Sequence, residues 1–327
     1  MLVYSVRRLL QSIPILVLST FVIFLMVASA VDPMTPYLTK RPPLSAAQLQ
    51  SLRVRFGLTH PLLQRYWDWL SGLVLHGSFG TSTQTNYQIG QQLGYAFEVT
   101  LRLVLGTILI ALILAILVGV ITAVRQYSKL DYATTTIGFL FLSLPTFWFA
   151  VLLKEWAIQI NEATGAHIFD TLWESSPNPP SGFLPQLWDA GQHMILPVLT
   201  LALLSYAAWS RFQRASMLEV LGSDYMRLAR AKGLSPTRVL LKHGLRNALI
   251  PLSTQVALDT AGLLSGAVIT ETIYSWRGMG LFFIQAIQTA DPNSVMAWLL
   301  VAALFVIIMN LAADLFYAVL DPRIRLA

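Results

Sequence analysis

A basic segment at residues 224–251 holds the residue types and spacing best suited to an interaction. It reads DYMRLARAKGLSPTRVLLKHGLRNALIP, with six Lys or Arg against a single acid, Asp224. Such a cluster is typical of segments that contact nucleic acid, an anionic membrane surface or a docking partner. The position of the segment relative to the apolar stretches of the chain decides among these functions.

Catalytic and metal-binding patterns are missing from the sequence. The chain has no cysteine, and its five histidines include no pair at metal-ligand spacing. The G-x-x-x-x-G-K-[ST] pattern of a P-loop is missing too, as are HExxH and paired-aspartate patterns within the apolar stretches. We therefore expect no metal, no cofactor and no catalytic residue, and we predict that the chain is not itself an enzyme.

Polar side chains inside apolar stretches form a second set of candidates. A polar group in lipid costs on the order of a few kcal/mol, so it is expected to face a bundle interior or a cavity. For Asp259 the alternatives are a pathway or subunit-interface role and a packed, hydrogen-bonded structural acid. Gly262 and Gly266 favour close helix packing over substrate contact. The candidates for a translocation pathway are Asp259, Thr260, Ser265, Glu271, Asn310 and Asp314.

The composition places these residues in a membrane protein. Of 327 residues, 55% are hydrophobic and 12% are charged, and the charged fraction is about half that of a soluble domain. A bilayer core needs roughly 20 apolar residues of helix. Pro145 and Pro197 introduce kinks that membrane helices tolerate. We predict an all-α polytopic membrane protein with six transmembrane helices at about 9–31, 98–124, 132–153, 193–213, 248–270 and 294–317.

Lys and Arg residues are distributed unequally between these spans. With the N-terminus inside, the inner segments hold fourteen of them and the two short outer loops hold one each. The positive-inside rule then places both termini and the 224–251 segment in the cytoplasm. The first span also resembles a signal peptide through Ala28 and Ala30, but its apolar run is longer than a signal core, which favours an uncleaved helix.

Capping residues divide the basic segment into two short helices. Ser223 or Asp224 suits the cap of a helix that begins at Tyr225, and Gly233 suits a left-handed turn at its end. The pair Ser235–Pro236 then begins a second helix that runs to His243. The two helices are predicted to form a compact elbow beneath the membrane.

The first of these two helices is amphipathic. Tyr225, Leu228 and Ala229 share one face, and the remaining surface is basic. So short a helix is marginal in water, and we expect a partner surface to stabilise it.

The 32–97 segment is predicted to be ordered. Residues Ser45–Gln48 form a capping-box pattern before a helix that Gly57 can end, and Pro61 suits the first turn of a second helix. The aromatic residues of that helix are expected either to lie at the lipid headgroup level or to pack the segment together. They are Tyr66, Trp67 and Trp69.

The 154–192 segment is rich in proline and is predicted to be an irregular outer connection. At its start, Lys154 and Glu155 are expected to reach the water as a solvated pair.

Several segments in order along the chain resemble one family. SMLEVLGSDYMRLARAKGLSPTRVLLKHGLRNALIP resembles the EAA-loop region of the permeases of binding-protein-dependent ABC importers, and it is nearest to their dipeptide, oligopeptide and nickel branch. The resemblance extends through RRLLQSIPILVL, LRVRFGLTHPLLQRYWDWL, SLPTFWFAVLL, HMILPVLTLAL, TETIYSWRGMGLF and DLFYAVLDPRIR. It implies a type I ABC importer permease architecture. The expected division is a first transmembrane helix at 1–31, an extracytoplasmic helical segment at 32–97 and a permease core at 98–327 with a coupling loop at 215–247.

The resemblance also implies partners. In such permeases this loop is a coupling helix that docks on a cytoplasmic ATPase, so peptides would enter the cytoplasm while ATP, with Mg, is hydrolysed on two partner subunits. A second homologous permease and an extracytoplasmic substrate-binding protein are implied as well, and nucleic acid is not. The residues implied to contact the ATPase are Asp224, Tyr225, Arg227, Leu228, Ala229, Arg230, Ala231, Lys232, Gly233, Leu234, Ser235, Arg238 and Lys242.

Departures from the family pattern concern mainly the outer face and the substrate. Arg227 stands in place of the glutamate that names the EAA loop, and Trp276-Arg277-Gly278 stands where relatives often have Trp-Pro-Gly. Nickel chelates, small glycans and haem-like compounds are the alternatives to peptides as cargo. An ion-coupled secondary transporter is the alternative class, but it calls for buried charges at mid-membrane and an internal inverted repeat, and the sequence offers at most Asp259.

Overall fold

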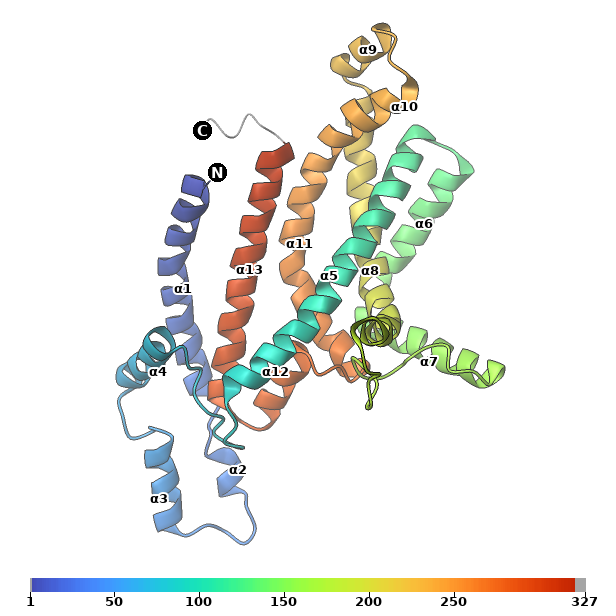
Figure 1. Cartoon of the computed structure of the whole chain (residues 1–327). Helices are drawn as coiled ribbons and strands as arrows, with labels where there is room; N and C mark the ends of the chain where they lie inside the picture. Colours follow the sequence, from blue (N-terminus) through green and yellow to red (C-terminus); the bar gives the residue numbers. More distant parts are fainter. Residues whose placement is uncertain (1, 321–327) are drawn as a thin grey trace. The chain divides into compact units, whose positions relative to one another are not determined.

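The computed structural model describes residues 2–320, except for the side chains at 2–6, 8, 9, 261, 264–266, 313, 314 and 316–320. Over this range its regular elements are helices, with one isolated β-bridge between Thr81 and Gln88 (Figure 1). The elements are α1 Leu2–Ala30, α2 Thr35–Leu38, α3 Ala46–Arg55, α4 Leu62–His76, α5 Ile89–Val124, α6 Lys129–Ser143, α7 Thr146–Thr164, α8 Phe183–Leu221, α9 Asp224–Ala231, α10 Pro236–Arg238, the π-helix η1 Val239–Leu245, α11 Arg246–Ile273, α12 Met279–Gln288 and α13 Pro292–Leu320.

The chain forms two compact units. The first, called here the N-terminal unit, comprises Leu2–Thr100 and Arg277–Ile307. The second, the central unit, comprises Leu101–Trp276 and the chain from Ile308 onward. The helices α5 and α13 each contribute residues to both units. The division of the chain at residues 31 and 97 stays a prediction.

Four helical stretches within residues 2–320 are long and apolar enough to cross a membrane, and the bent pair of α6 and α7 makes up to five. The four are Leu10–Leu38, Ile89–Val124, Phe183–Leu221 and Pro292–Ala312. The predicted fifth span, 248–270, lies inside α11, which stands outside this set. The helical, multi-pass character of the chain is thus confirmed, whereas the count of six spans stays a prediction.

The predicted span 132–153 is a pair of helices rather than one kinked helix. The helix α6 ends at Ser143, α7 begins at Thr146, and their axes differ by 107°. Pro145 disfavours helical dihedrals at the residue before it, and Leu144 accordingly has φ −84° and ψ 129°. The prediction of a tolerated kink was therefore too mild at Pro145, whereas Pro197 lies inside the continuous helix α8 as expected.

The central unit is built around α8, which packs against α6, α7 and α11. The helix α5 approaches α8 closely at Gly119, where an added Cβ would lie 2.9 Å from the Ser210 carbonyl oxygen. A buried carboxylate, Asp131, fixes the start of α6 to α8. The Arg214 guanidinium donates to its two oxygens at 2.8 and 2.7 Å, and the Tyr127 amide donates at 3.0 Å. This fork geometry is the strong form of an ion pair and joins two helices across one charge.

The C-terminal end of α11 is held by Lys154 and Tyr274. The Lys154 ammonium donates to the Ile273 carbonyl at 2.7 Å, so the expectation of a solvated Lys154–Glu155 pair was wrong for the lysine. A cation at the last carbonyls of a helix is a favourable cap. The Tyr274 hydroxyl donates to the Ala150 carbonyl at 3.1 Å. Burial raises the pKa of Tyr274 to about 12, so this donor keeps its proton at neutral pH.

The predicted irregular connection begins later than expected, because α7 continues to Thr164. Beyond it the backbone is fixed by two side chains. The Asn161 amide oxygen accepts from the Ile168 and Phe169 amides at 2.9 and 3.0 Å, and Asp189 accepts from the Ser176 amide at 3.0 Å. Side-chain acceptors of this kind replace the backbone partners that a loop lacks.

The N-terminal unit joins α4 to α1 through Tyr66. Its ring packs against Phe21 and Phe24, and its hydroxyl lies 3.1 Å from both the Thr20 hydroxyl and the Val17 carbonyl. Trp67 in contrast is 66% exposed. Tyr66 thus packs the unit internally, which is one of the two predicted roles. Trp67 faces outward, and its position at the lipid headgroup level stays a prediction.

Caps in the N-terminal unit agree with the sequence. Ser45 and Gln48 form the predicted capping box of α3, Gly57 follows with φ +66°, and Pro61 precedes α4. A further cap was not predicted. Asp291 accepts from the Ser294 amide at 3.4 Å and from the Ser294 hydroxyl at 2.8 Å at the start of α13.

Candidate coupling site

The helix α9 forms where the sequence predicts it. Ser223 holds the extended conformation of an N-cap residue, with φ −72° and ψ 154°. Its hydroxyl donates to the Val220 carbonyl at 2.6 Å instead of capping α9. Asp224 lies in the first turn and Arg230 in the last, so both charges complement the helix macrodipole.

The turn after α9 requires glycine. Gly233 has φ +75°, in the left-handed region that other residues rarely adopt. The Lys232 and Gly233 amides donate to the Leu228 and Arg230 carbonyls at 3.0 and 2.9 Å. Ser235 and Pro236 then begin α10, as expected.

The second arm of the elbow is the beginning of a long helix rather than a separate short one. The helix α10 passes directly into η1, and η1 passes into α11. The wide turn brings Gly244 close to α8 and α9. A Cβ added at Gly244 would lie 2.9 Å from Met217 Cε and 3.2 Å from Met226 Cε. Wide turns of this kind occur often at functional sites. This continuity could not be predicted, because a π-helix has no characteristic amino-acid composition.

An apolar contact braces α9 against this second arm. Met226, Ala229 and Val239 are buried together and pack against Leu221 and Leu234. Burying a methionine side chain stabilises by about 1.5–3 kcal/mol. Ala229 is buried in this contact, whereas Tyr225 and Leu228 are exposed, so the three residues that were predicted to share one apolar face differ in burial. Met226, which was not among the predicted apolar residues, supplies much of the inward face.

The outward surface of α9 is apolar at its centre and basic around it. Tyr225 is 42% exposed and Leu228 is 57% exposed. Arg227 forms an ion pair with Asp224, and the Arg230 guanidinium donates to the Leu221 carbonyl at 3.4 Å. Of the predicted contact residues, Ala229 is buried and Leu234 half-buried. The exposed ones are Asp224, Tyr225, Arg227, Leu228, Arg230, Ala231, Lys232, Gly233, Ser235, Arg238 and Lys242.

The elbow lies at one end of α8 and α11 (Figure 1). It is attached to both helices, since η1 contacts α8 and continues as α11. Met217 of α8 packs with Ala248 of α11 immediately behind it. The elbow is thus joined to α8 by packing and to α11 by the continuous chain.

The Asp259 carboxylate is hydrogen-bonded at the place where α8 packs against α11. The Trp209 indole nitrogen donates to it at 2.7 Å and the Gln255 amide donates at 2.9 Å. Both oxygens are thereby engaged, which is the geometry expected for a structural acid.

Three other predicted pathway residues are described by the structure, and they differ in their surroundings. Thr260 is buried, and its hydroxyl donates to the Val256 carbonyl at 2.7 Å. It lines an apolar groove of about 270 Å³ between α5, α11 and the end of α13. Glu271 is fully buried at the far end of α11, and Asn310 is exposed. The side chains of Ser265 and Asp314 lie outside the described residues.

Metal-binding groups are not found among the described residues: no three His, Cys, Asp or Glu side chains converge there.

Comparison with known families identifies the chain. The family described as "Binding-protein-dependent transport system inner membrane component" matches residues 115–326. The N-terminal membrane component of the same systems matches residues 1–119. The chain therefore belongs to the inner-membrane components of binding-protein-dependent transport systems, as the resemblance implied, and it is a multi-pass inner-membrane protein.

Its relatives are permeases. It is 41% identical over 324 residues to the oligopeptide transport system permease protein OppB of Mycobacterium tuberculosis, covering 99% of each chain. It is 36% identical to the oligopeptide permease AppB of Bacillus subtilis over 331 residues, covering 99% of this chain and 100% of that protein. It is 34% identical to the dipeptide permease DppB of Escherichia coli K12 over 340 residues, covering 99% of each.

A solved structure shares the fold. A chain of the MetNI methionine ABC transporter, in an inward-facing conformation, superposes with a TM-score of 0.55 at 17% identity. The match covers 71% of this chain and 97% of that one.

Proposed function

We propose that the chain is the translocation subunit of an ABC importer that carries di- or oligopeptides into the cytoplasm. Family membership over nearly the whole length and the names of the relatives support this function. Nickel chelates, small glycans and haem-like compounds are the alternative cargoes. Identification of the ligand of the associated extracytoplasmic binding protein distinguishes among them.

The observation that carries the mechanism is the braced elbow. Its outward face combines Tyr225 and Leu228 with a basic surround, which suits an apolar anchor with charged steering groups at a protein interface. Its inward face is packed on η1, which continues as α11. We infer that a partner ATPase docks on the outward face and that its movement displaces α8 and α11 together.

The proposed assembly contains this chain, a second homologous permease, two cytoplasmic ATPases that bind ATP and Mg, and an extracytoplasmic binding protein. Six transmembrane spans with both termini in the cytoplasm place the elbow on the ATPase side. Among the pathway candidates, the groove beside Thr260 supports a role at the pathway or at a subunit interface. The bonding of Asp259 to Trp209 and Gln255 argues against a proton-coupled transporter, because both carboxylate oxygens are engaged.

Reversing two elbow charges tests the coupling. We expect Arg230→Glu with Lys232→Glu to lower the substrate-stimulated ATPase activity of the purified complex at least 10-fold, because like-charge contacts at an interface cost several kcal/mol. The matched control is Lys40→Glu with Arg53→Glu, which reverses two exposed charges in the 32–97 segment. Stimulated activity at the wild-type level in the elbow variant would show that this surface does not contact the ATPase.

A further inference from the structure

Arg65 is a half-buried cation without an ion-pair partner among the described residues. Its guanidinium carbon lies 5.9 Å from the centre of the Phe24 ring. Burial lowers the pKa of Arg65, and no neighbouring carboxylate offsets this effect. A partly desolvated cation without a counterion is less stable than a paired one. Binding of an anion beside Arg65 is therefore expected to be favourable.

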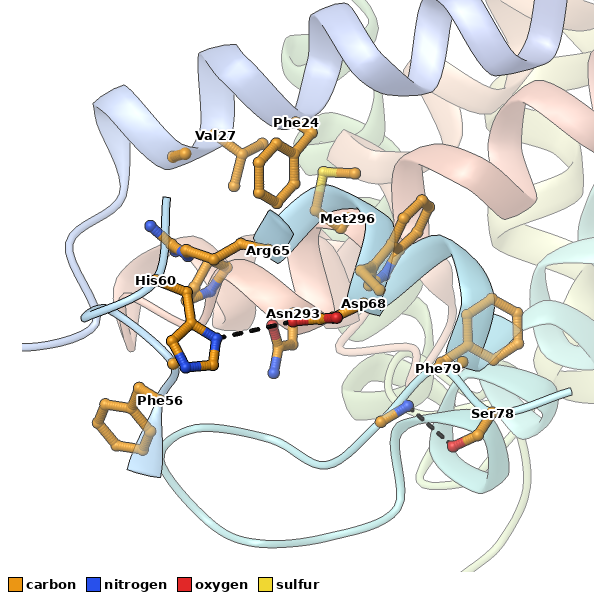
Figure 2. Close-up of a pocket in the computed structure, with 16 residues that line it drawn as sticks. Phe24, Val27, Phe56, His60, Arg65, Asp68, Ser78, Phe79, Asn293 and Met296 are labelled. Atoms are coloured by element: carbon orange, nitrogen blue, oxygen red, sulfur yellow. Dashed lines mark hydrogen bonds and ion pairs between the residues drawn. The ribbon is translucent and has the colours of Figure 1, made fainter. Parts of the chain in front are cut away.

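Arg65 lines a pocket of about 280 Å³ in the N-terminal unit (Figure 2). One wall is the end of α1 with Phe24 and Val27, and another is α4 itself. The segment after α3, with Phe56, and the start of α13, with Met296, complete it. This volume lies just below the roughly 300 Å³ at which sites for small molecules usually begin. It suits a polar headgroup rather than a whole amphiphile.

Trp69 also lines the pocket, but its indole nitrogen is covered by protein atoms and makes no hydrogen bond to any described residue. The donor that the pocket presents to a ligand is therefore the Arg65 guanidinium. A guanidinium is suited to the oxygens of a phosphate, which it can bind in a bidentate manner.

The pocket also holds a negative group apart from Arg65. Asp68 lines it, and one of its carboxylate oxygens lies 3.8 Å from His60 Nδ1. A dashed line marks this contact in Figure 2. The carboxylate is 57% exposed, so it can accept from a further cation. A ligand that carries both an anion and a cation therefore matches the pocket better than a simple anion does.

The surroundings of the pocket indicate where such a ligand comes from. On α1, next to Phe24, the side chains of Val22, Leu25 and Met26 are 47%, 38% and 64% exposed. On α4, Leu63 and Trp67 are 69% and 66% exposed. In an inner-membrane protein such surfaces face lipid, and an exposed tryptophan is typical of the headgroup level. Acyl chains can therefore run along α1 from the pocket.

We propose that this pocket binds the headgroup of a zwitterionic aminophospholipid such as phosphatidylethanolamine. Its phosphate accepts from Arg65, and its ammonium donates to Asp68. Lipid at this position fills the space between α1, α4 and the start of α13.

Native mass spectrometry of the full complex, released from nanodiscs of equal phosphatidylethanolamine and phosphatidylglycerol, tests the proposal. We expect wild type to retain phosphatidylethanolamine preferentially. Arg65→Gln should lower its retention about 10-fold, as loss of a charged donor predicts. Asp68→Asn should bring the ratio of the two lipids toward one. Arg65→Lys, which keeps the charge, should retain part of the binding.

Arg53→Gln is the control, since Arg53 is an exposed arginine of α3 in the same unit. Equal lipid retention by Arg65→Gln and Arg53→Gln would overturn the proposal. Soluble phosphoethanolamine that binds in an Arg65-dependent manner, while no lipid is retained, would overturn the lipid source. Unchanged lipid retention with loss of the extracytoplasmic protein from Arg65→Gln would identify a protein-docking site instead.

Discussion

Two parts of the chain are built on the same local plan and end in different attachments. The elbow has a short helix, a left-handed glycine and a proline-initiated second helix, at Gly233 and Pro236. The α3–α4 segment repeats this order, with Gly57 at φ +66° and Pro61 before α4. Yet α10 continues through η1 into α11, whereas α4 ends at His76 and lies against α1. The same turn chemistry thus leads into a continuous long helix in one place and into a separate helix that lines a pocket in the other.

The largest effect on stability and transport is expected from disrupting the buried contact of Met226, Ala229 and Val239 that holds α9 in the elbow. Met226→Asp places an uncompensated charge in a fully buried position, which should destabilise the protein by about 3–5 kcal/mol and abolish coupled transport. Thermal unfolding followed by tryptophan fluorescence and substrate-stimulated ATPase activity measure the two effects.

Leu228→Asp is the matched control for this brace, because Leu228 is 57% exposed on the same helix. Its unfolding should stay within about 0.5 kcal/mol of wild type, while coupling falls because the apolar contact face is lost. Equal destabilisation by both variants would mean that α9 does not pack with Met226 buried and Leu228 exposed.

A pair of glycine variants distinguishes the elbow from the α3–α4 segment. Gly233→Val and Gly57→Val impose a similar strain of about 1–2 kcal/mol, because each glycine has a positive φ and open space around its Cβ position. We expect a several-fold loss of stimulated ATPase activity from Gly233→Val alone. If Gly57→Val lowers the stimulated activity as much, the proposed difference between the two segments fails.

The smallest effect is expected at the first cap of the α3–α4 segment. Ser45→Ala removes the capping box of α3 and should cost about 1 kcal/mol locally. Hydrogen exchange of the α3 amides should rise, with transport unchanged. A fall in transport comparable to that of Gly233→Val would show that α3 takes part in coupling.

Local chemistry could be predicted from the sequence in both segments. The cap at Ser45, the helix start at Ser235–Pro236 and the turns at Gly57 and Gly233 depend on residues close together in the sequence, so single-sequence patterns suffice for them. The family resemblance was equally accessible, since its segments are contiguous. The exposed basic surface of the elbow could also be predicted from the sequence.

What could not be predicted depends on packing between distant elements. Ala229 turns inward because Val239 lies behind it, and Lys154 reaches Ile273 across more than a hundred positions. Neither contact leaves a periodic signal in the sequence. The orphaned donor of Trp69 was likewise invisible, because it is defined by what the surrounding fold fails to supply.

The break at Pro145 has a consequence for the membrane itself. The helix α6 has 15 residues and is therefore roughly 22 Å long, at about 1.5 Å of rise per residue, and α7 turns away from it by 107°. A hydrocarbon slab is about 30 Å thick, so this pair falls several ångström short. We expect the bilayer to thin locally beside α6, because thinning is one of the ways in which lipid adapts to a span shorter than its hydrocarbon core.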